Sequence, residues 1–189
     1  MSSLTDFGDL AVLLPLAAAI LLWLFVAGER RVALWWLVAL TLCLGVIGML
    51  KIYFAACPAG AMRSPSGHAG FSVLVYGMIA ACLATRAKGH WRLIVLVGGG
   101  VVIAAIALSR LVLGVHTPIE IALGLLIGGA SLTALLWGSA AFGAARPPLR
   151  PLLIAAVLII VLLHGQELHA EAVLHAMGRY LARAGGVCS

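Results

Sequence analysis

The sequence predicts an all-α integral membrane protein built as a bundle of six transmembrane helices. Of its 189 residues, 64% are hydrophobic and only 10% are charged, and the mean hydropathy is +1.19. Six apolar runs have about the length that a bilayer requires. A water-soluble domain of this size needs far more polar surface, so composition excludes a soluble globular protein.

The six runs are expected to form one domain covering residues 1–189, because no repeat, linker or change of composition divides them. A helix of about 20 residues crosses the roughly 30 Å hydrocarbon layer. The expected spans are residues 10–28, 32–53, 68–85, 91–113, 116–138 and 151–169. An acidic segment precedes the first run, which indicates a retained helix rather than a signal peptide. Residues 170–189 have apolar side chains at helical spacing with arginines between them, which is typical of a short interfacial helix.

Small residues, cysteines and tryptophans add three expectations. The glycines at 98–100 and in 124–130 predict close approach of helix backbones. The four cysteines show no paired short spacing, so no zinc site, redox motif or disulfide framework is expected. Tryptophans at the membrane interface or facing lipid are expected at Trp35, Trp36, Trp91 and Trp137.

The positive charges predict how the bundle is oriented. The net charge of +6 is scattered over helix ends rather than gathered in one stripe, so nucleic acid is not an expected partner. Three alternate loops carry Arg30 and Arg31, then Arg86, Lys88 and Arg92, then Arg146 and Arg150. The positive-inside rule makes these loops cytoplasmic. We therefore expect a multi-pass protein of the bacterial inner membrane whose other loops face the periplasm or exterior.

Seven polar side chains are expected at one depth on the outer side. They come from three separate stretches and are Lys51, Arg63, His68, Ser109, Arg110, His116 and Glu120. Ionisable groups inside or at the ends of spans are costly and tend to mark function. Lys51 fits phosphate binding or a side chain extended to the interface equally well, and Arg63 could instead complement acidic lipid headgroups.

The stretch SPSGH predicts a helix start that can hold an anion. Ser64 suits the N-cap and Pro65 suits the first helical position. The amides of Ser66, Gly67 and His68 would then lack intrahelical acceptors, and the helix dipole would favour a phosphate-like anion. The alternative is a well-capped helix with an incidental histidine.

The stretch SRLVLGVHTPIE predicts a histidine with a carboxylate partner. The Arg110 guanidinium can hold two phosphate oxygens. Glu120 follows His116 by four residues, so a helix containing both would place them on one face. Thr117 and Glu120 also fit a capping box, in which Glu120 ties off the helix start. The two roles of Glu120 do not exclude each other.

These residues resemble the signature of the type-2 phosphatidic acid phosphatase family, the membrane relatives of vanadium haloperoxidases. That signature has three parts: lysine, six residues and arginine-proline; PSGH; and serine-arginine, five residues, histidine, three residues and aspartate. PSGH is complete at 65–68, and the third part matches from Ser109 to position 120, where glutamate replaces aspartate. The first part is incomplete, because Lys51 is followed at the required distance by Pro58 and Ala59.

The resemblance implies an enzyme, a lipid phosphatase with a phosphohistidine intermediate. It implies that His116 attacks phosphorus, that Glu120 orients its ring, and that His68 protonates the departing oxygen and then activates water. The phosphate would be bound by Lys51, Arg110, Ser66, Gly67 and Ser109, with Arg63 as one replacement for the missing arginine. With one carboxylate in the cluster, no metal and no other cofactor is expected.

The substrate is expected to reach such a site from the bilayer, because the headgroup can enter while the tail stays in lipid. Undecaprenyl diphosphate, phosphatidic acid and phosphatidylglycerol phosphate are the candidates, and the short loops favour prenyl diphosphates. Two alternatives remain open. The same histidine could pass phosphate to a lipid hydroxyl, or the chain could be a non-catalytic lipid transporter or scaffold that retains an anion site.

Overall fold

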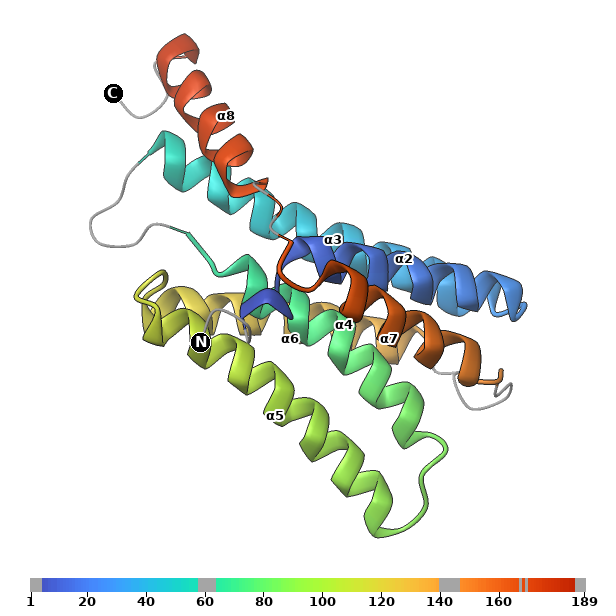
Figure 1. The fold of residues 1–189 in the computed structure, drawn as a ribbon. Coiled ribbons are helices and arrows are strands. Elements are labelled where there is room, and N and C mark those ends of the chain that lie inside the picture. Colours follow the sequence, from blue (N-terminus) through green and yellow to red (C-terminus); the bar gives the residue numbers. More distant parts are fainter. Residues whose placement is uncertain (1–4, 58–63, 140–146, 167, 169, 186–189) are drawn as a thin grey trace.

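The computed structural model describes residues 5–57, 64–139, 147–166, 168 and 170–185, and every regular element in these ranges is a helix (Figure 1). The helices are α2 (Leu10–Val26), α3 (Arg30–Ala56), α4 (Gly67–Ala84), α5 (His90–Val112), α6 (Pro118–Gly138), α7 (Arg150–Leu163) and α8 (Ala170–Gly185). The predicted all-α class is confirmed for the described part of the chain.

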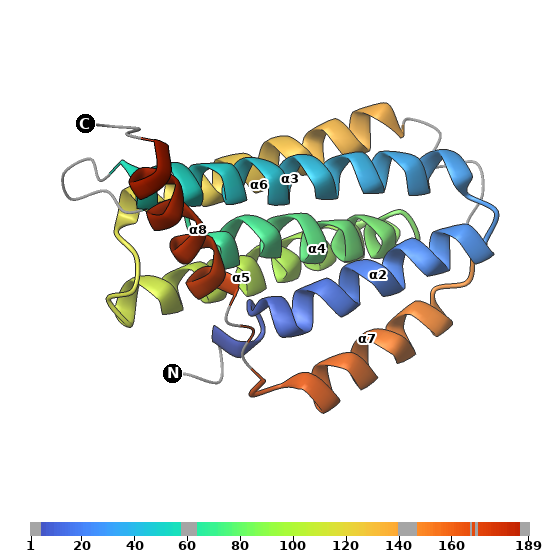
Figure 2. The same cartoon turned by 90° about the horizontal axis from the view of Figure 1, so that it is seen from above.

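Four of the helices, α3 to α6, are long and apolar enough to cross a membrane. The apolar helices α2 and α7 are shorter, with 17 and 14 residues. At 1.5 Å per residue they extend about 26 Å and about 21 Å, less than the ~30 Å hydrocarbon layer. Figure 2 shows α2 and α7 running roughly alongside the longer helices. The described chain thus has four candidate spans and two shorter apolar helices.

Several predicted span boundaries are off by two residues or more, as at α3, which runs over Arg30–Ala56 instead of 32–53. The span expected over 151–169 is too long, because α7 ends at Leu163 and a turn follows that contains Gly165 with φ of 84°. The span expected over 116–138 begins two residues too early. Thr117 has extended backbone angles and is the N-cap, so α6 begins at Pro118.

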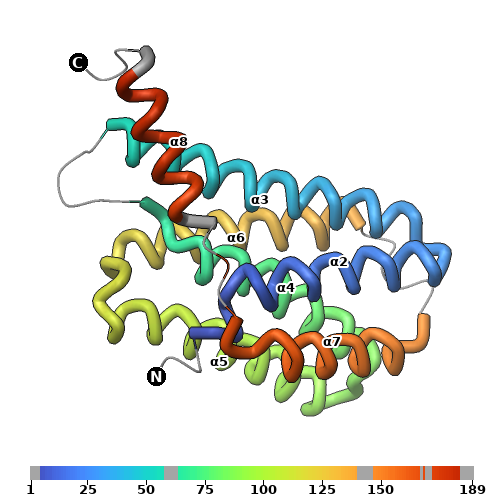
Figure 3. Tube along the Cα trace, turned by 45° about the horizontal axis from the view of Figure 1, so that its top comes forward, coloured from blue at the N-terminus to red at the C-terminus, as the bar shows by residue number. Residues whose placement is uncertain are grey.

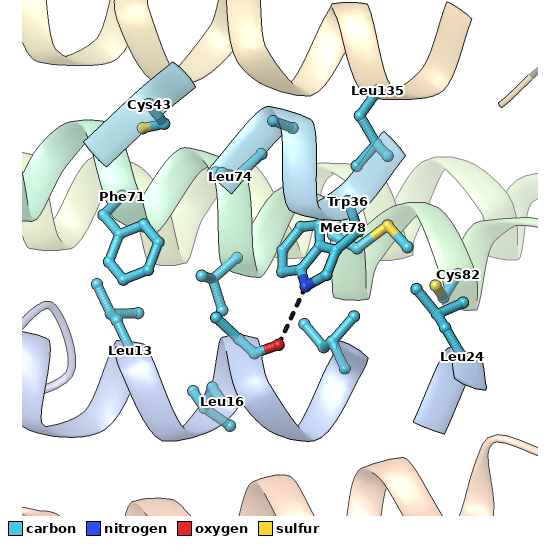
Figure 4. Packing of buried hydrophobic residues seen from close by; sticks show 14 of the residues in the cluster. Leu13, Leu16, Leu24, Trp36, Cys43, Phe71, Leu74, Met78, Cys82 and Leu135 are labelled. Carbon is cyan, nitrogen blue, oxygen red and sulfur yellow. Dashed lines mark hydrogen bonds between the residues drawn. The ribbon is translucent and has the colours of Figure 1, made fainter. Parts of the chain in front are cut away.

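The core lies between α2, α3, α4, α7 and the end of α6, and Figure 4 shows part of it. Trp36 is fully buried there, and its indole nitrogen donates a hydrogen bond of 3.0 Å to the carbonyl oxygen of Ala17. The expectation that Trp36 faces lipid or the interface is therefore wrong, because a helix carbonyl satisfies its N–H inside the bundle. Trp91 and Trp137 are exposed, as expected.

Glycines hold α4 and α6 in backbone contact. A Cβ at Gly128 would collide with the carbonyl oxygen of Gly70, and one at Gly124 with the carbonyl oxygen of Ser66. Close approach is thus confirmed for the 124–130 segment, where small residues let two backbones meet. In the 98–100 segment it holds at Gly99, where an added Cβ would collide with the Cβ of Ala80, but not at Gly98 or Gly100, where it would meet open space.

The helix expected within residues 170–189 is present as α8. It packs on the end of α3, where Gly178 lies against the carbonyl of Ile52 and the Cβ of Ala55. Figures 1 and 3 show α8 at the end of α3, set at an angle to the long helices of the bundle. Val173 and Tyr180 of α8 are exposed. The placement of α8 at the membrane interface stays a prediction.

Cys57 differs from the other described cysteines. It is disulfide-bonded at the C-cap of α3, whereas Cys43 and Cys82 are free and buried. The expectation of no disulfide is wrong at Cys57, because the fold and not the spacing brings cysteines together. Cys188 lies outside the described residues.

Candidate active site

The start of α4 carries the SPSGH stretch, but its cap lies two residues later than predicted. Ser66, not Ser64, is the N-cap, and its hydroxyl accepts a hydrogen bond of 3.4 Å from the amide of Ala69. The amide of Ser66 donates to the carbonyl oxygen of Glu120 at 2.9 Å, so it is already engaged. The first two helical amides, those of Gly67 and His68, have no acceptor within their own helix. An anion at this helix end would meet those two amides.

Lys51 lies over the first turn of α4. It is buried near the end of α3, and an ideal Cβ placed on Gly67 would lie 3.5 Å from its Cε. A buried ammonium needs a compensating polar partner or anion. Lys51, Gly67 and His68 line one cavity of about 70 Å³ between α2, α3, α4 and the segment entering α8. This cavity has room for a small polar group but not for a whole lipid.

His68 faces a carboxylate that the sequence did not identify as part of the site. Its Nε2 lies 3.4 Å from Oδ2 of Asp9, which precedes α2 and lines the same cavity. Burial tends to raise the pKa of Asp9, but bonds from His68 and from the amides of Ala11 and Leu168 outweigh it, so the pKa lies below the ordinary 3.8. Asp9 is therefore ionised beside His68 at neutral pH.

The turn between α5 and α6 delivers His116 to the same end of the bundle. The amide of Gly114 bonds to the carbonyl of Leu111, and the amide of Val115 bonds to the carbonyl of Arg110. With a φ of 65° at Gly114, this is a Schellman ending of α5, for which glycine is favoured. The turn places the amide of His116 3.4 Å from the carbonyl of Arg110.

His116 pairs with Glu120 as the spacing suggested, although His116 lies just before the helix. Nδ1 of His116 is 2.9 Å from Oε2 of Glu120, and both side chains are buried. The same oxygen accepts the amide of Thr117 at 3.1 Å, while the Thr117 hydroxyl accepts the amide of Glu120 at 3.4 Å. The capping box is confirmed, and it coexists with the histidine pair. With Nδ1 engaged, Nε2 is the ring nitrogen that can act as a nucleophile.

The two histidine regions are joined through backbone contacts. The bond from the amide of Ser66 to the carbonyl of Glu120 links the start of α4 to the first turn of α6. The glycine contacts described above continue this interface along both helices. Figure 2 shows the end of α3, the start of α4, the α5–α6 turn and α8 at one end of the bundle.

One predicted site residue, Ser109, makes its hydrogen bonds elsewhere in the bundle, and another lies outside the described residues. The Ser109 hydroxyl donates to the carbonyl of Ile106 at 2.7 Å and accepts from the hydroxyl of Thr5 at 3.0 Å, so its donor is engaged within the bundle. Arg63 lies outside the described residues. Arg110 is buried in the last turn of α5. Neither Arg110 nor His116 belongs to the described lining of the cavity beside His68.

Histidines beyond the cluster have local contacts. The ring of His164 lies 4.9 Å from that of Phe7, and its Nε2 is 3.9 Å from Asp6. Glu167, the suggested partner of His164, lies outside the described residues. Among the residues that the structure describes, there is no group of three or more histidine, cysteine or acidic side chains placed to hold a metal ion.

The chain belongs to the PAP2 superfamily, which residues 51–144 match. This family supports phosphatase-type chemistry, and together with the apolar helices it indicates a multi-pass membrane protein. The chain is also similar to an uncharacterized 22.5 kDa protein of the cps region of Klebsiella pneumoniae, with 30% identity over 129 residues. That match covers 66% of this chain and 62% of the relative. No solved structure matches the chain.

Proposed function

We propose that the protein is a metal-independent phosphatase of lipid phosphates or diphosphates that works through a phosphohistidine at His116. The observation that carries this proposal is the buried pair of His116 and Glu120, in which Glu120 holds the ring through Nδ1 and so makes Nε2 the attacking atom. Membership of the PAP2 superfamily supports phosphatase chemistry. Glutamate in place of aspartate does not prevent the pairing, because the extended Thr117 backbone puts His116 within its reach.

In the first step, Nε2 of His116 attacks phosphorus, and the bond from phosphorus to the bridging oxygen breaks. The departing oxygen takes a proton from His68, so that it leaves as a hydroxyl group or a lipid monophosphate. The positive charge that develops on His116 is stabilised by Glu120, which accepts the Nδ1 proton as a hydrogen bond. This step leaves a phosphoryl group on His116.

In the second step, water attacks phosphorus and the bond to Nε2 breaks. His68, now neutral, takes a proton from the water, and His116 returns to its neutral form. The net reaction consumes one water and releases inorganic phosphate.

The oxygens of the transferred group would be bound by positive and donor groups at the same end of the bundle. Lys51 and the amides of Gly67 and His68 surround the start of α4, and Arg110 would supply a planar fork from the end of α5. We propose no phosphate contact for Ser109, since its hydroxyl already donates to a carbonyl. A phosphate role for Arg63 remains part of the proposal as one option for completing the site.

The substrate is proposed to be a membrane lipid, with undecaprenyl diphosphate, phosphatidic acid and phosphatidylglycerol phosphate as candidates. The outward surfaces of α3 and α5 carry exposed apolar side chains, such as Leu42, Leu93 and Val101, which suit contact with lipid tails. A site at the end of such helices can accept a headgroup while the tail remains in the hydrocarbon layer.

The orientation proposed for this site is periplasmic or exterior, in a six-span inner-membrane topology in which α2 and α7 also cross. Arg30, Lys88 and Arg150 lie at or near helix starts at the end of the bundle away from the site, which supports a cytoplasmic assignment for that end. The disulfide at Cys57, at the site end, supports an oxidising compartment there.

Labelling tests this orientation. A membrane-impermeant thiol reagent added to intact cells should modify a cysteine placed at the exposed Val115 but not one placed at the exposed Lys88. The opposite pattern would place the site in the cytoplasm.

A trapping experiment tests the function itself. Purified protein mixed briefly with a ³²P-labelled lipid phosphate and quenched in alkali should carry label on His116, since phosphohistidine survives alkali, and should release free phosphate over time. The variant His116→Ala should lose both signals, and His90→Ala should retain both, because His90 is exposed at the opposite end of the bundle. Unchanged activity in His116→Ala would refute the nucleophile. Activity that a chelator removes and magnesium restores would refute the metal-free scheme.

A further inference from the structure

We propose that Asp9 is a positioning residue for His68, holding its ring through Nε2 so that Nδ1 carries the proton exchanged with the departing oxygen and with water. The inference rests on the proposed function, because it concerns the acid–base histidine of that reaction. Asp9 lies outside the residues that match the family, 51–144. The inference is based on contacts between the segment before α2 and the first turn of α4.

The two oxygens of Asp9 have separate tasks. Oδ1 accepts the amide of Ala11 at 2.8 Å, which caps α2, and the amide of Leu168 at 3.1 Å, which ties the segment entering α8 to the same point. Oδ2 faces Nε2 of His68 at 3.4 Å. A cap needs only one acceptor oxygen, so capping does not account for the second oxygen's position beside the imidazole.

The segment that carries Asp9 is itself fixed against α4 and α5. The hydroxyl of Tyr76 donates to the carbonyl of Phe7 at 2.7 Å, and Thr5 bonds to Ser109. A Cβ on Gly8 would lie 3.4 Å from Cδ2 of His68 and would collide with Ile106. The backbone thus packs directly on one edge of the imidazole, and the carboxylate is presented by a held segment rather than by a free end.

Asp9 is the acidic residue that lines the described cavity beside His68. The charged residues lining that cavity are Asp9 from the start of α2 and Lys51 from α3, while the segment entering α8 contributes Leu168 and α5 contacts the same region through Ile106. A carboxylate at Nε2 favours the tautomer with its proton on Nε2 and stabilises the protonated ring. Nδ1 then gives a proton in the first step and takes one from water in the second.

The experiment compares two substrates of equal chain length, a dodecyl phosphate and a nitrophenyl phosphate carrying a dodecyl chain. Nitrophenolate leaves without a proton, so a defect in proton donation affects the alkyl substrate more strongly. Asp9→Asn keeps an acceptor oxygen for the cap of α2 but removes the charge at His68. We expect kcat/KM, which reports the step in which the leaving group departs, to fall about 10- to 100-fold for the alkyl phosphate and less than about threefold for the aryl phosphate.

Two further variants distinguish a catalytic effect from a folding defect. Asp9→Ser also caps a helix but is too short to reach His68, and it should reproduce the selective loss. Asp6→Asn removes a neighbouring carboxylate that faces His164 instead, and it should leave both rates unchanged. Thermal unfolding in detergent should show Tm values for Asp9→Asn within a few degrees of the parent.

The outcomes separate this inference from the proposed function. If Asp9→Asn and Asp9→Ser lower both substrates by the same factor, or neither, while the parent protein is active and labels His116, the inference is wrong and the proposed function stands. If the parent releases no phosphate from either substrate, the proposed function fails and the inference fails with it.

Discussion

His116 and Glu120 meet within a single turn at the start of α6, whereas His68 and Asp9 are brought together from two helices. The first pair depends on backbone that the capping box already fixes, and its oxygen–nitrogen distance is 2.9 Å. The second pair depends on how the segment before α2 packs on α4, and its distance is 3.4 Å. A local pair is set by helix-end geometry, while a pair between helices is only as well defined as the packing that supports it.

The largest expected effect comes from breaking the support that both pairs share. Gly128→Leu places a side chain against the carbonyl of Gly70 and forces α4 away from α6. We expect a destabilisation above about 4 kcal/mol and loss of detectable phosphatase activity, since the side chain meets backbone that cannot yield. Thermal unfolding and phosphate release would measure both.

Gly129→Leu is the matched control for this change. It makes the same substitution one residue further along α6, where an added Cβ meets open space. It should retain the fold and the activity. Equal behaviour of the two variants would show that the glycine contact does not hold the site together.

The next effect distinguishes the two carboxylates. Glu120→Gln keeps a residue that suits the third position of a capping box but removes the charge beside His116. We expect kcat to fall about 10³-fold, more than for Asp9→Asn, because the developing charge lies on the attacking ring. Glu120→Asp should restore part of the activity. If Asp9→Asn proved the more damaging of the two, the assignment of nucleophile and acid–base histidine would have to be exchanged.

A smaller effect is expected from the cap itself. Thr117→Ala removes the hydroxyl that accepts the amide of Glu120 but leaves the hydrogen bond that Glu120 accepts from Nδ1 of His116. We expect a loss of about 1 kcal/mol in the free energy of unfolding, with kcat changed less than about threefold. Thr117→Ser should match the parent protein. A kcat loss as large as that of Glu120→Gln would show that Glu120 acts mainly through the cap.

Much of the fold could be predicted from the sequence because its determinants are local. Hydropathy located the helices, and the glycines of 124–130 predicted close approach to another helix, which the structure identifies as α4. Helix ends were less well predicted, because Ser64 and Ser66 are both good caps and the contact of Ser66 with α6 selects the second. The burial of Trp36 and the bond at Cys57 also depend on partners distant in the chain.

In the candidate site, too, contacts within one stretch of sequence could be predicted and contacts between distant stretches could not. The pairing of His116 with Glu120 was visible as a four-residue spacing, and Lys51 beside the start of α4 was expected from its depth. Asp9 was not among the predicted site residues, although a carboxylate just before the first apolar run was a signal that could have drawn attention to it. No spacing links it to His68, because the pair exists only once α2 packs on α4.

The smallest effect follows from the ionisation of Asp9. Its pKa is lowered in the folded protein, so the unfolded chain binds the proton more tightly and the stability that this carboxylate contributes is present above its ordinary pKa. That contribution is lost as the pH falls below about 4. The difference in Tm between the parent and Asp9→Asn should therefore shrink as the pH falls from neutral to that range. A difference that grew on acidification would show that Asp9 is not stabilised as an anion.

The central claim is that both histidine–carboxylate pairs serve one phosphoryl site at the shared end of α3, α4, α5 and α6. An experimental structure of the protein with bound orthovanadate tests it most directly, because vanadate adopts the geometry of phosphorus under attack. The account predicts vanadium bonded to Nε2 of His116, with its oxygens at Lys51 and at the amides of Gly67 and His68. Vanadate bound at His68 without His116, or two imidazoles opening into separate cavities, would contradict it.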